Sequence, residues 1–127
     1  MSKKINISSG NFCTTATLNN SRWAEYLYTR LPLDGSCQFW GDELFFSTSI
    51  SMEEDSQSLE TVSIGDIAFW PPGSAFCIFW GPTPISNGKE IRPASKVNLL
   101  GSVDSQLIKI KDLNPGAKIL LSKFEGM

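Results

Sequence analysis

Short stretches in which apolar and polar residues alternate run along most of the chain and predict β-strands. Residues 4–8 alternate isoleucine with polar side chains, and residues 12–18 are rich in β-branched side chains. Gly10 and Asn11 lie between these two stretches and predict a hairpin turn. Similar patterns predict further strands at 37–40, 43–50, 64–70, 75–80, 97–103 and 117–124.

One segment instead has the spacing of an amphipathic helix. Trp23, Leu27 and Leu31 recur at every fourth position, which places them on one face of a helix of about ten residues. Candidate N-cap residues precede it at 19–21, and Pro32 ends it because the residue before a proline avoids helical backbone. One early helix and about eight short strands favour a single domain over residues 1–127, built as a β-barrel or a sandwich.

Glycine and proline mark the turns between the predicted strands. Residues 41–42 separate two aromatic runs, and proline-containing segments at 71–73 and 81–84 flank the apolar strand at 75–80. The pair Asn87-Gly88 predicts a two-residue hairpin, because both types of residue tolerate positive φ. The acidic run at 53–56 is interpreted as a solvated turn, since adjacent residues cannot aim enough oxygens at one cation.

Composition then narrows the classes of function. The 127 residues include no histidine, which excludes Ser-His-Asp triads, Cys-His pairs and histidine metal ligands. The formal net charge of −2 offers no basic face, so we expect no nucleic-acid partner. No apolar run is long enough for a membrane helix and no apolar leader follows the first residues, so we expect no membrane partner and a cytoplasmic location.

The three cysteines, Cys13, Cys37 and Cys77, have no CxxC spacing and are odd in number. We therefore expect buried free thiols and neither a disulfide framework nor a zinc site. The chain also lacks a phosphate loop and a dinucleotide-binding fingerprint. The sequence accordingly predicts no metal and no cofactor.

One long block of residues is similar to a known family. Residues 64–73 (IGDIAFWPPG) and 75–84 (AFCIFWGPTP), followed by 92–95 (RPAS) and 97–98 (VN), resemble the signature of small prokaryotic cyclophilin-like barrel proteins without an assigned activity. Shorter stretches at 16–18, 31–33 and 40–43 agree, so the resemblance covers nearly the whole chain. It implies a mainly β protein, a closed eight-stranded cyclophilin-like β-barrel with one capping α-helix.

The resemblance does not extend to the polar groups of true cyclophilins, which isomerise the bond before proline. Those enzymes use an arginine on the third strand, with histidine and aromatic residues completing the pocket. Here residues 43–46 carry no arginine, and Val97 lies where the histidine would be expected. The chain's arginines are Arg22 and Arg30 on the predicted helix and Arg92 in a loop.

The dense aromatic set in the centre of the chain suggests where a ligand could bind. Because neighbouring strand residues point to opposite faces, one of Phe69 and Trp70 belongs to the core and the other faces outward, and the same holds for Phe79 and Trp80. We predict a ligand-binding site that includes the following residues: Glu43, Trp70, Phe79, Arg92 and Asn98.

Each polar member of this set also has a structural interpretation. Arg92 is either a solvated charge or a clamp for a carboxylate or a peptide carbonyl. Asn98, among apolar residues, is expected to hold the 81–84 loop by a backbone hydrogen bond if it is buried. Glu43, beside a glycine turn, is expected to accept hydrogen bonds from backbone amides rather than to act as a general base.

Three functional hypotheses follow. The first is a non-enzymatic or weakly catalytic binding module for a small molecule or an extended peptide. The second is an accessory or catalytic domain related to the cyclophilin-like subunits of amide-hydrolysing enzymes, which rests on the fold alone. The third is a peptidyl-prolyl isomerase, against which the missing arginine and histidine argue. The sequence leaves the oligomeric state open.

Overall fold

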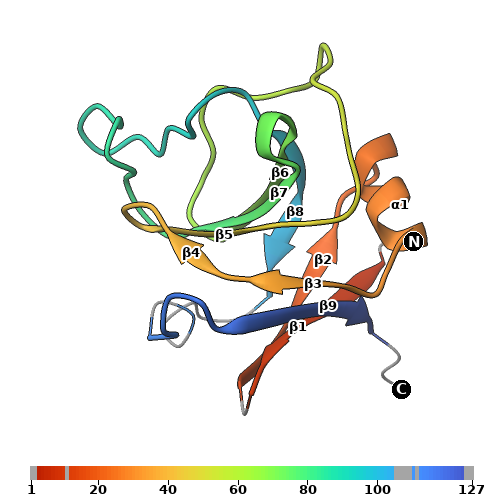
Figure 1. Ribbon diagram of the computed structural model, residues 1–127. Coiled ribbons are helices and arrows are strands. Elements are labelled where there is room, and N and C mark those ends of the chain that lie inside the picture. The colour runs from red at the N-terminus through yellow and green to blue at the C-terminus, as the bar shows by residue number, and fades with distance from the viewer. Residues whose placement is uncertain (1–2, 11, 105–109, 111, 125–127) are drawn as a thin grey trace.

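One antiparallel sheet curls into a nearly closed barrel (Figure 1). The computed structural model describes residues 3–10, 12–104, 110 and 112–124. The sheet has nine strands in the order β3-β9-β1-β2-β8-β6-β7-β5-β4. The strands are β1 (Lys4–Ser9), β2 (Phe12–Leu18), β3 (Leu33–Ser36), β4 (Gln38–Phe39), β5 (Glu43–Ser47), β6 (Asp66–Trp70), β7 (Ala75–Phe79), β8 (Asn98–Val103) and β9 (Lys118–Lys123).

The two edges of the sheet are consecutive parts of one chain segment. β3 pairs with β9 and β4 pairs with β5, and only Cys37 separates β3 from β4. The backbone of Cys37 still bonds to the segment before β9, since its N–H donates to Ala117 O and its carbonyl accepts from Gly116 N. The predicted mainly β barrel is therefore confirmed, with nine strands rather than eight. The additional strand is β3, which the sequence pattern did not predict and which is separate from β4 because the segment changes partner at Cys37.

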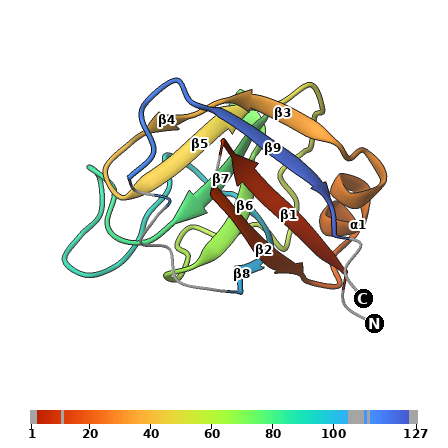
Figure 2. The same cartoon turned by 90° about the horizontal axis from the view of Figure 1, so that it is seen from below.

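The single described α-helix also follows the sequence pattern. α1 (Arg22–Thr29) lies at one end of the barrel (Figure 2) and buries Ala24 and Leu27. The Ser21 hydroxyl caps it by accepting a hydrogen bond from Ala24 N at 3.1 Å. Among the described residues, no helix has the length and apolar character needed to cross a membrane.

Two apolar clusters occupy the two faces of the central strands. The barrel interior contains Phe46, Phe69 and Phe76, all fully buried, with 5.6 Å between the ring centroids of Phe46 and Phe76. The alternate residues of β7 point outward and form a second cluster beneath the loop 80–97. That cluster contains Ala68, Ala75, Cys77, Phe79, Ile91 and Val97.

The loop 80–97 differs from the prediction made for it. Gly88 has the positive φ of a turn, +64°, but no strand flanks Asn87-Gly88. The loop instead meets the 48–65 segment through isolated bridges, in which Leu59 pairs with Val97 and Val62 with Ile91. The predicted hairpin is wrong because these long-range bridges and the packing of Ile91 and Val97 on the outer face replace local strand pairing.

Candidate functional site

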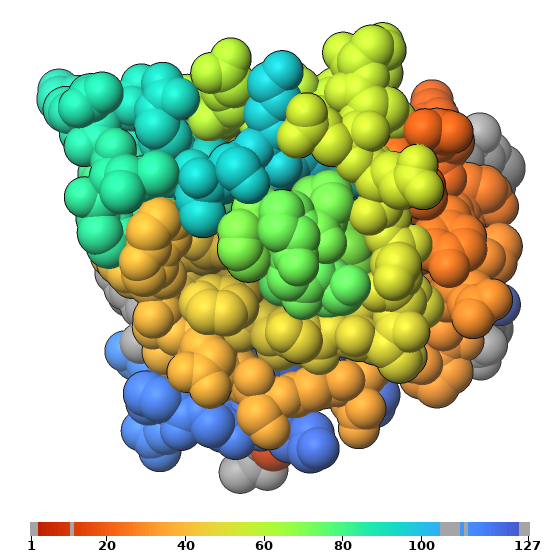
Figure 3. Space-filling model, turned by 45° about the horizontal axis from the view of Figure 1, so that its top comes forward, coloured from red at the N-terminus to blue at the C-terminus, as the bar shows by residue number. Residues whose placement is uncertain are grey.

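A cavity of about 190 Å³ lies on the outer face of the barrel, between the central strands and the segment 93–97. In Figure 3 the surface is hollowed where the chain around β5, the turn after β6 and this segment meet. We call this cavity the Glu43 pocket. Its walls are formed by Trp40, Glu43, Phe45, Trp70, Ala75, Cys77, Pro93, Ala94 and Val97.

Strand register explains why these side chains share a face. Phe45 on β5 lies opposite Cys77 on β7, and Trp70 on β6 lies opposite Ala75 on β7. Side chains directly opposite one another on paired strands point to the same side of the sheet. Glu43 is two residues before Phe45, so its side chain points to this side as well.

Glu43 is the acidic group of the pocket, and only 6% of its surface is exposed. Burial disfavours the ionised carboxylate and raises the pKa of Glu43 from 4.5 to about 7, although a hydrogen bond with the Cys77 thiol acts in the opposite direction. Burial also raises the pKa of Cys77, so this thiol stays protonated, and its Sγ donates a hydrogen bond to Ala75 O at 3.7 Å. Near pH 7 the Glu43 carboxyl group is therefore present in both its protonated and its ionised form.

Trp70 and the segment 93–97 fix the rim of the pocket. The indole Nε1 of Trp70 donates a hydrogen bond to Ser95 Oγ at 2.7 Å. The chain after β6 passes close to the same ring, since a Cβ at Gly73 would lie 2.7 Å from Trp70 Cζ3. These contacts hold one large aromatic wall in place without a ligand.

The structure brings together two of the five predicted site residues. Glu43 and Trp70 line the pocket. Phe79 has no exposed surface and packs in the cluster below the loop, so it supports the pocket without lining it. Arg92 lies in a separate groove with Lys96.

The Arg92 guanidinium has carboxylate partners within the chain. Its Nε donates to Glu90 Oε2 at 2.8 Å, and its Nη1 lies 3.7 Å from Glu60 Oε1. The hydrogen bond from Arg92 lowers the pKa of Glu90. Of these two pairs, the one with Glu60 links the loop 80–97 to the 48–65 segment, because Glu90 lies in the same loop as Arg92.

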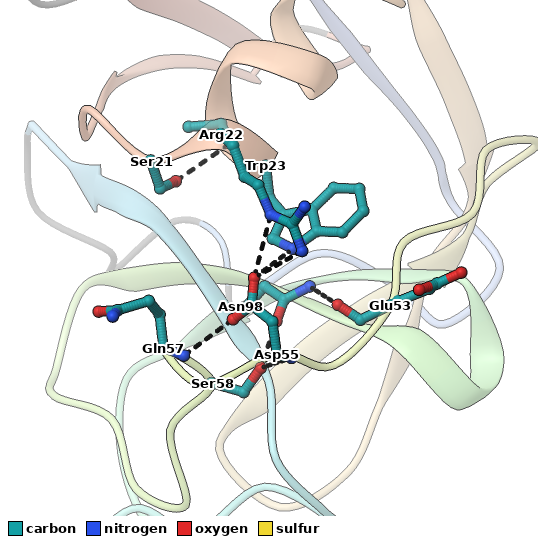
Figure 4. Close-up of polar contacts among 9 residues, drawn as sticks. Ser21, Arg22, Trp23, Glu53, Asp55, Gln57, Ser58 and Asn98 are labelled. Atoms are coloured by element: carbon teal, nitrogen blue, oxygen red, sulfur yellow. Dashed lines mark hydrogen bonds and ion pairs between the residues drawn. The ribbon is translucent and has the colours of Figure 1, made fainter.

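Asn98 belongs to a polar network on another part of the barrel (Figure 4). Its Oδ1 accepts a hydrogen bond from Ser58 Oγ at 2.6 Å, and its Nδ2 donates to Glu53 O at 3.0 Å. The expectation that Asn98 holds the 81–84 loop is therefore wrong. The residue holds the acidic segment 53–58 instead, a contact forty positions away that local sequence does not reveal.

The same network lines a larger cavity of about 440 Å³ beside α1. Asp55 Oδ2 accepts from Arg22 Nη2 at 3.1 Å and from Trp23 Nε1 at 3.0 Å, while Gln57 N donates to Oδ1 at 2.9 Å. The Gln57 N–H, with Arg22 and Trp23, lowers the pKa of Asp55. Since these polar groups satisfy one another, the smaller Glu43 pocket is the better candidate for a binding site.

Replacing Asn98 with alanine is expected to loosen the 53–58 segment. The change removes two hydrogen bonds and leaves partly buried partners unpaired, so the free energy of unfolding should fall by about 1–3 kcal/mol. Urea denaturation measures this loss, with Asn87→Ala at an exposed loop position as the matched control. Equal midpoints for the two variants would contradict the structural role of Asn98.

Sequence reasoning missed several residues of the pocket and misplaced one cysteine. Trp40, Phe45 and Cys77 were not predicted as site residues, although the alternation of Cys77 with the inward Phe76 was visible. Cys37 and Cys77 are buried free thiols as expected, whereas Cys13 is exposed because it faces outward on β2. The described residues contain no group of histidine, cysteine or carboxylate side chains that could hold a metal.

Comparisons with known proteins agree with this architecture. A family model described as cyclophilin-like matches residues 3–122. The solution structure of the hypothetical protein AF2241 from Archaeoglobus fulgidus is 31% identical, with a TM-score of 0.81 over 97% of this chain and 95% of that one. A comparison with curated proteins found no match.

A more distant similarity concerns the fold alone. A structure of McbB in complex with tryptophan aligns with a TM-score of 0.64 and 17% identity. The alignment covers 97% of this chain but only 45% of McbB.

Proposed function

This chain belongs to the cyclophilin-like family, and we propose that it is a binding module whose ligand, a small molecule or an extended peptide, occupies the Glu43 pocket. The observation that supports this most is a preformed apolar cavity with one buried carboxyl group at its wall. Ligand sites are typically concave and mostly apolar, with a few polar groups that fix the ligand's orientation. A carboxyl group whose pKa is strongly shifted by burial is a further mark of such sites.

The dimensions of the pocket limit what it can take. A cavity of about 190 Å³ accommodates a small molecule or one side chain of a longer peptide. No arginine or lysine of the described residues lines it, and the chain has no histidine. These absences leave the pocket without the cationic and imidazole groups that prolyl isomerisation was expected to need.

An NMR titration of the ¹⁵N-labelled chain tests this proposal. The panel contains small amines, acids, amides, short proline-containing peptides and tryptophan, the last because the McbB structure holds it. We expect at least one compound to produce saturable shifts at the backbone amides of Cys77 and Val97 and at the Trp70 indole N–H.

Two variants test whether the ligand binds in the Glu43 pocket. Ala94→Phe fills the pocket from its exposed rim and should weaken binding roughly tenfold or more, which corresponds to about 1.4 kcal/mol. Asn87→Phe adds the same ring to the same loop outside the pocket and should leave binding unchanged. Shifts confined to α1 and Trp23, or no shifts with any compound, would refute the proposal.

A further inference from the structure

We propose that the ligand of the Glu43 pocket is a small organic amine, bound as an ammonium ion against the Glu43 carboxylate with its apolar body between the aromatic walls. This inference rests on the proposed function, because it names the class of ligand for the same pocket. It depends on the charges around Glu43 and on the nature of the walls.

The ionised form of Glu43 has no positive partner in the described structure. From β7, the titratable group that faces it is the Cys77 thiol, which is neutral. On β6, Asp66 lies on the same face as Ala68 by alternation. It is acidic and so offers Glu43 no positive charge, and its Oδ2 accepts a hydrogen bond from Ser63 N at 2.8 Å. On β4, the residue paired with Phe45 is the uncharged Gln38.

The loop above the pocket supplies no counter-charge either. The loop has three cations, Lys89, Arg92 and Lys96, and none of them lines the pocket. Arg92 and Lys96 line the neighbouring groove, which meets the pocket at Pro93 and Ala94, and Arg92 is paired with Glu90 and Glu60. Lys89 lies at an exposed position of the loop. A buried carboxylate is costly unless it is paired and hydrogen-bonded. An ammonium group donates up to three hydrogen bonds and brings the missing charge, so it complements this position better than a neutral or anionic group.

The walls of the pocket favour the same class of ligand. Trp40, Phe45 and Trp70 line the pocket together with Glu43, so aromatic side chains form much of its wall. Aromatic faces attract cations electrostatically, and this attraction strengthens where water is excluded. An anionic ligand would require Glu43 to be protonated and would gain nothing from these faces.

The proposal predicts a specific dependence of affinity on pH. An ammonium ion binds the ionised carboxylate, whose population rises as pH passes through the Glu43 pKa of about 7. From pH 5.5 to pH 8 the ionised fraction of the free protein, and hence the affinity, increases about 30-fold. A simple aliphatic amine stays protonated over this range, as lysine does.

Three compounds with the same ring separate the possible ligand classes: 2-phenylethylamine, 2-phenylethanol and phenylacetate. Their dissociation constants are measured by NMR titration at pH 5.5 and pH 8. The amine is expected to bind most tightly at pH 8 and about 30-fold more weakly at pH 5.5. Glu43→Gln should weaken amine binding at pH 8 by roughly tenfold or more and abolish the pH dependence.

The matched control is Glu54→Gln, a change of the same chemistry at an exposed position, which should alter neither result. Equal or tighter binding of the alcohol or phenylacetate at pH 8 would overturn the amine proposal and leave a binding pocket in place. Absence of amine binding at pH 8 would also overturn it. Amine binding that Ala94→Phe leaves intact would place the ligand elsewhere, and then this inference and the proposed function would both fail.

Discussion

Replacing Glu43 with glutamine is expected to make the protein more stable than the wild type at pH 8, by about 3 kcal/mol. The Glu43 pKa is about 7 in the folded protein and 4.5 for the exposed group. Between these values the folded state binds more protons than the unfolded state, so stability falls as pH rises. The loss begins near pH 4.5 and is complete a little above pH 7, whereas glutamine has no charge to bury.

Urea denaturation from pH 4 to pH 8 measures this effect. The free energies of unfolding of wild type and Glu43→Gln should nearly coincide at pH 4 and diverge steadily as pH rises. Glu54→Gln, at an exposed position, should follow the wild type throughout. Parallel curves for the wild type and Glu43→Gln over this range would show that the Glu43 carboxyl is not desolvated in the folded state.

Gly101→Ala is expected to destabilise the barrel by more than about 3 kcal/mol. Gly101 lies on β8 at an irregularity in its pairing with β6, and its φ is +154°. A Cβ there would lie 2.0 Å from the carbonyl oxygen of Thr17 on the neighbouring β2. That oxygen belongs to the paired backbone, so the clash can be relieved only by moving one strand away from the other.

Gly116→Ala separates this clash from simple backbone strain. Gly116 also has a positive φ, +89°, but a Cβ there would meet nothing within 4 Å. Its substitution should therefore cost only the strain of an unfavourable φ, about 1–3 kcal/mol. Thermal or urea unfolding of the two variants should show the larger loss for Gly101→Ala, and equal losses would contradict the tight approach of β2 and β8.

Much of the barrel could be predicted because its strands carry their own signal. In β6, Ile67 and Phe69 alternate with Ala68 and Trp70, and the structure places the two pairs on opposite faces. The spacing of Trp23 and Leu27 likewise predicted α1, with a cap at Ser21. These patterns depend only on the period of each element and on residues next to it.

The grouping of the site residues could not be predicted in the same way. Alternation showed that Phe69 and Trp70 point to opposite faces, but it did not show which of the two faces outward or which loop covers that face. Asn98 and Arg92 are close in sequence to Val97, yet contacts with the 48–65 segment direct them to separate places. Those contacts join residues far apart in the chain, so no local pattern contains them.

The expectation for Glu43 failed for a related reason. An acidic residue after a glycine turn commonly accepts hydrogen bonds from backbone amides, and this interpretation used only its neighbours in sequence. Its burial comes instead from β7 and from the segment 93–97, which close the pocket around it. The raised pKa of Glu43 is thus a property of the assembled barrel.

The decisive experiment is a crystal structure of the protein with 2-phenylethylamine at pH 8. We expect the amine in the Glu43 pocket, with its nitrogen about 3 Å from a Glu43 carboxylate oxygen and its ring between Phe45 and Trp70. An amine found instead in the cavity beside Trp23 and Asp55, with the Glu43 pocket empty, would contradict this expectation.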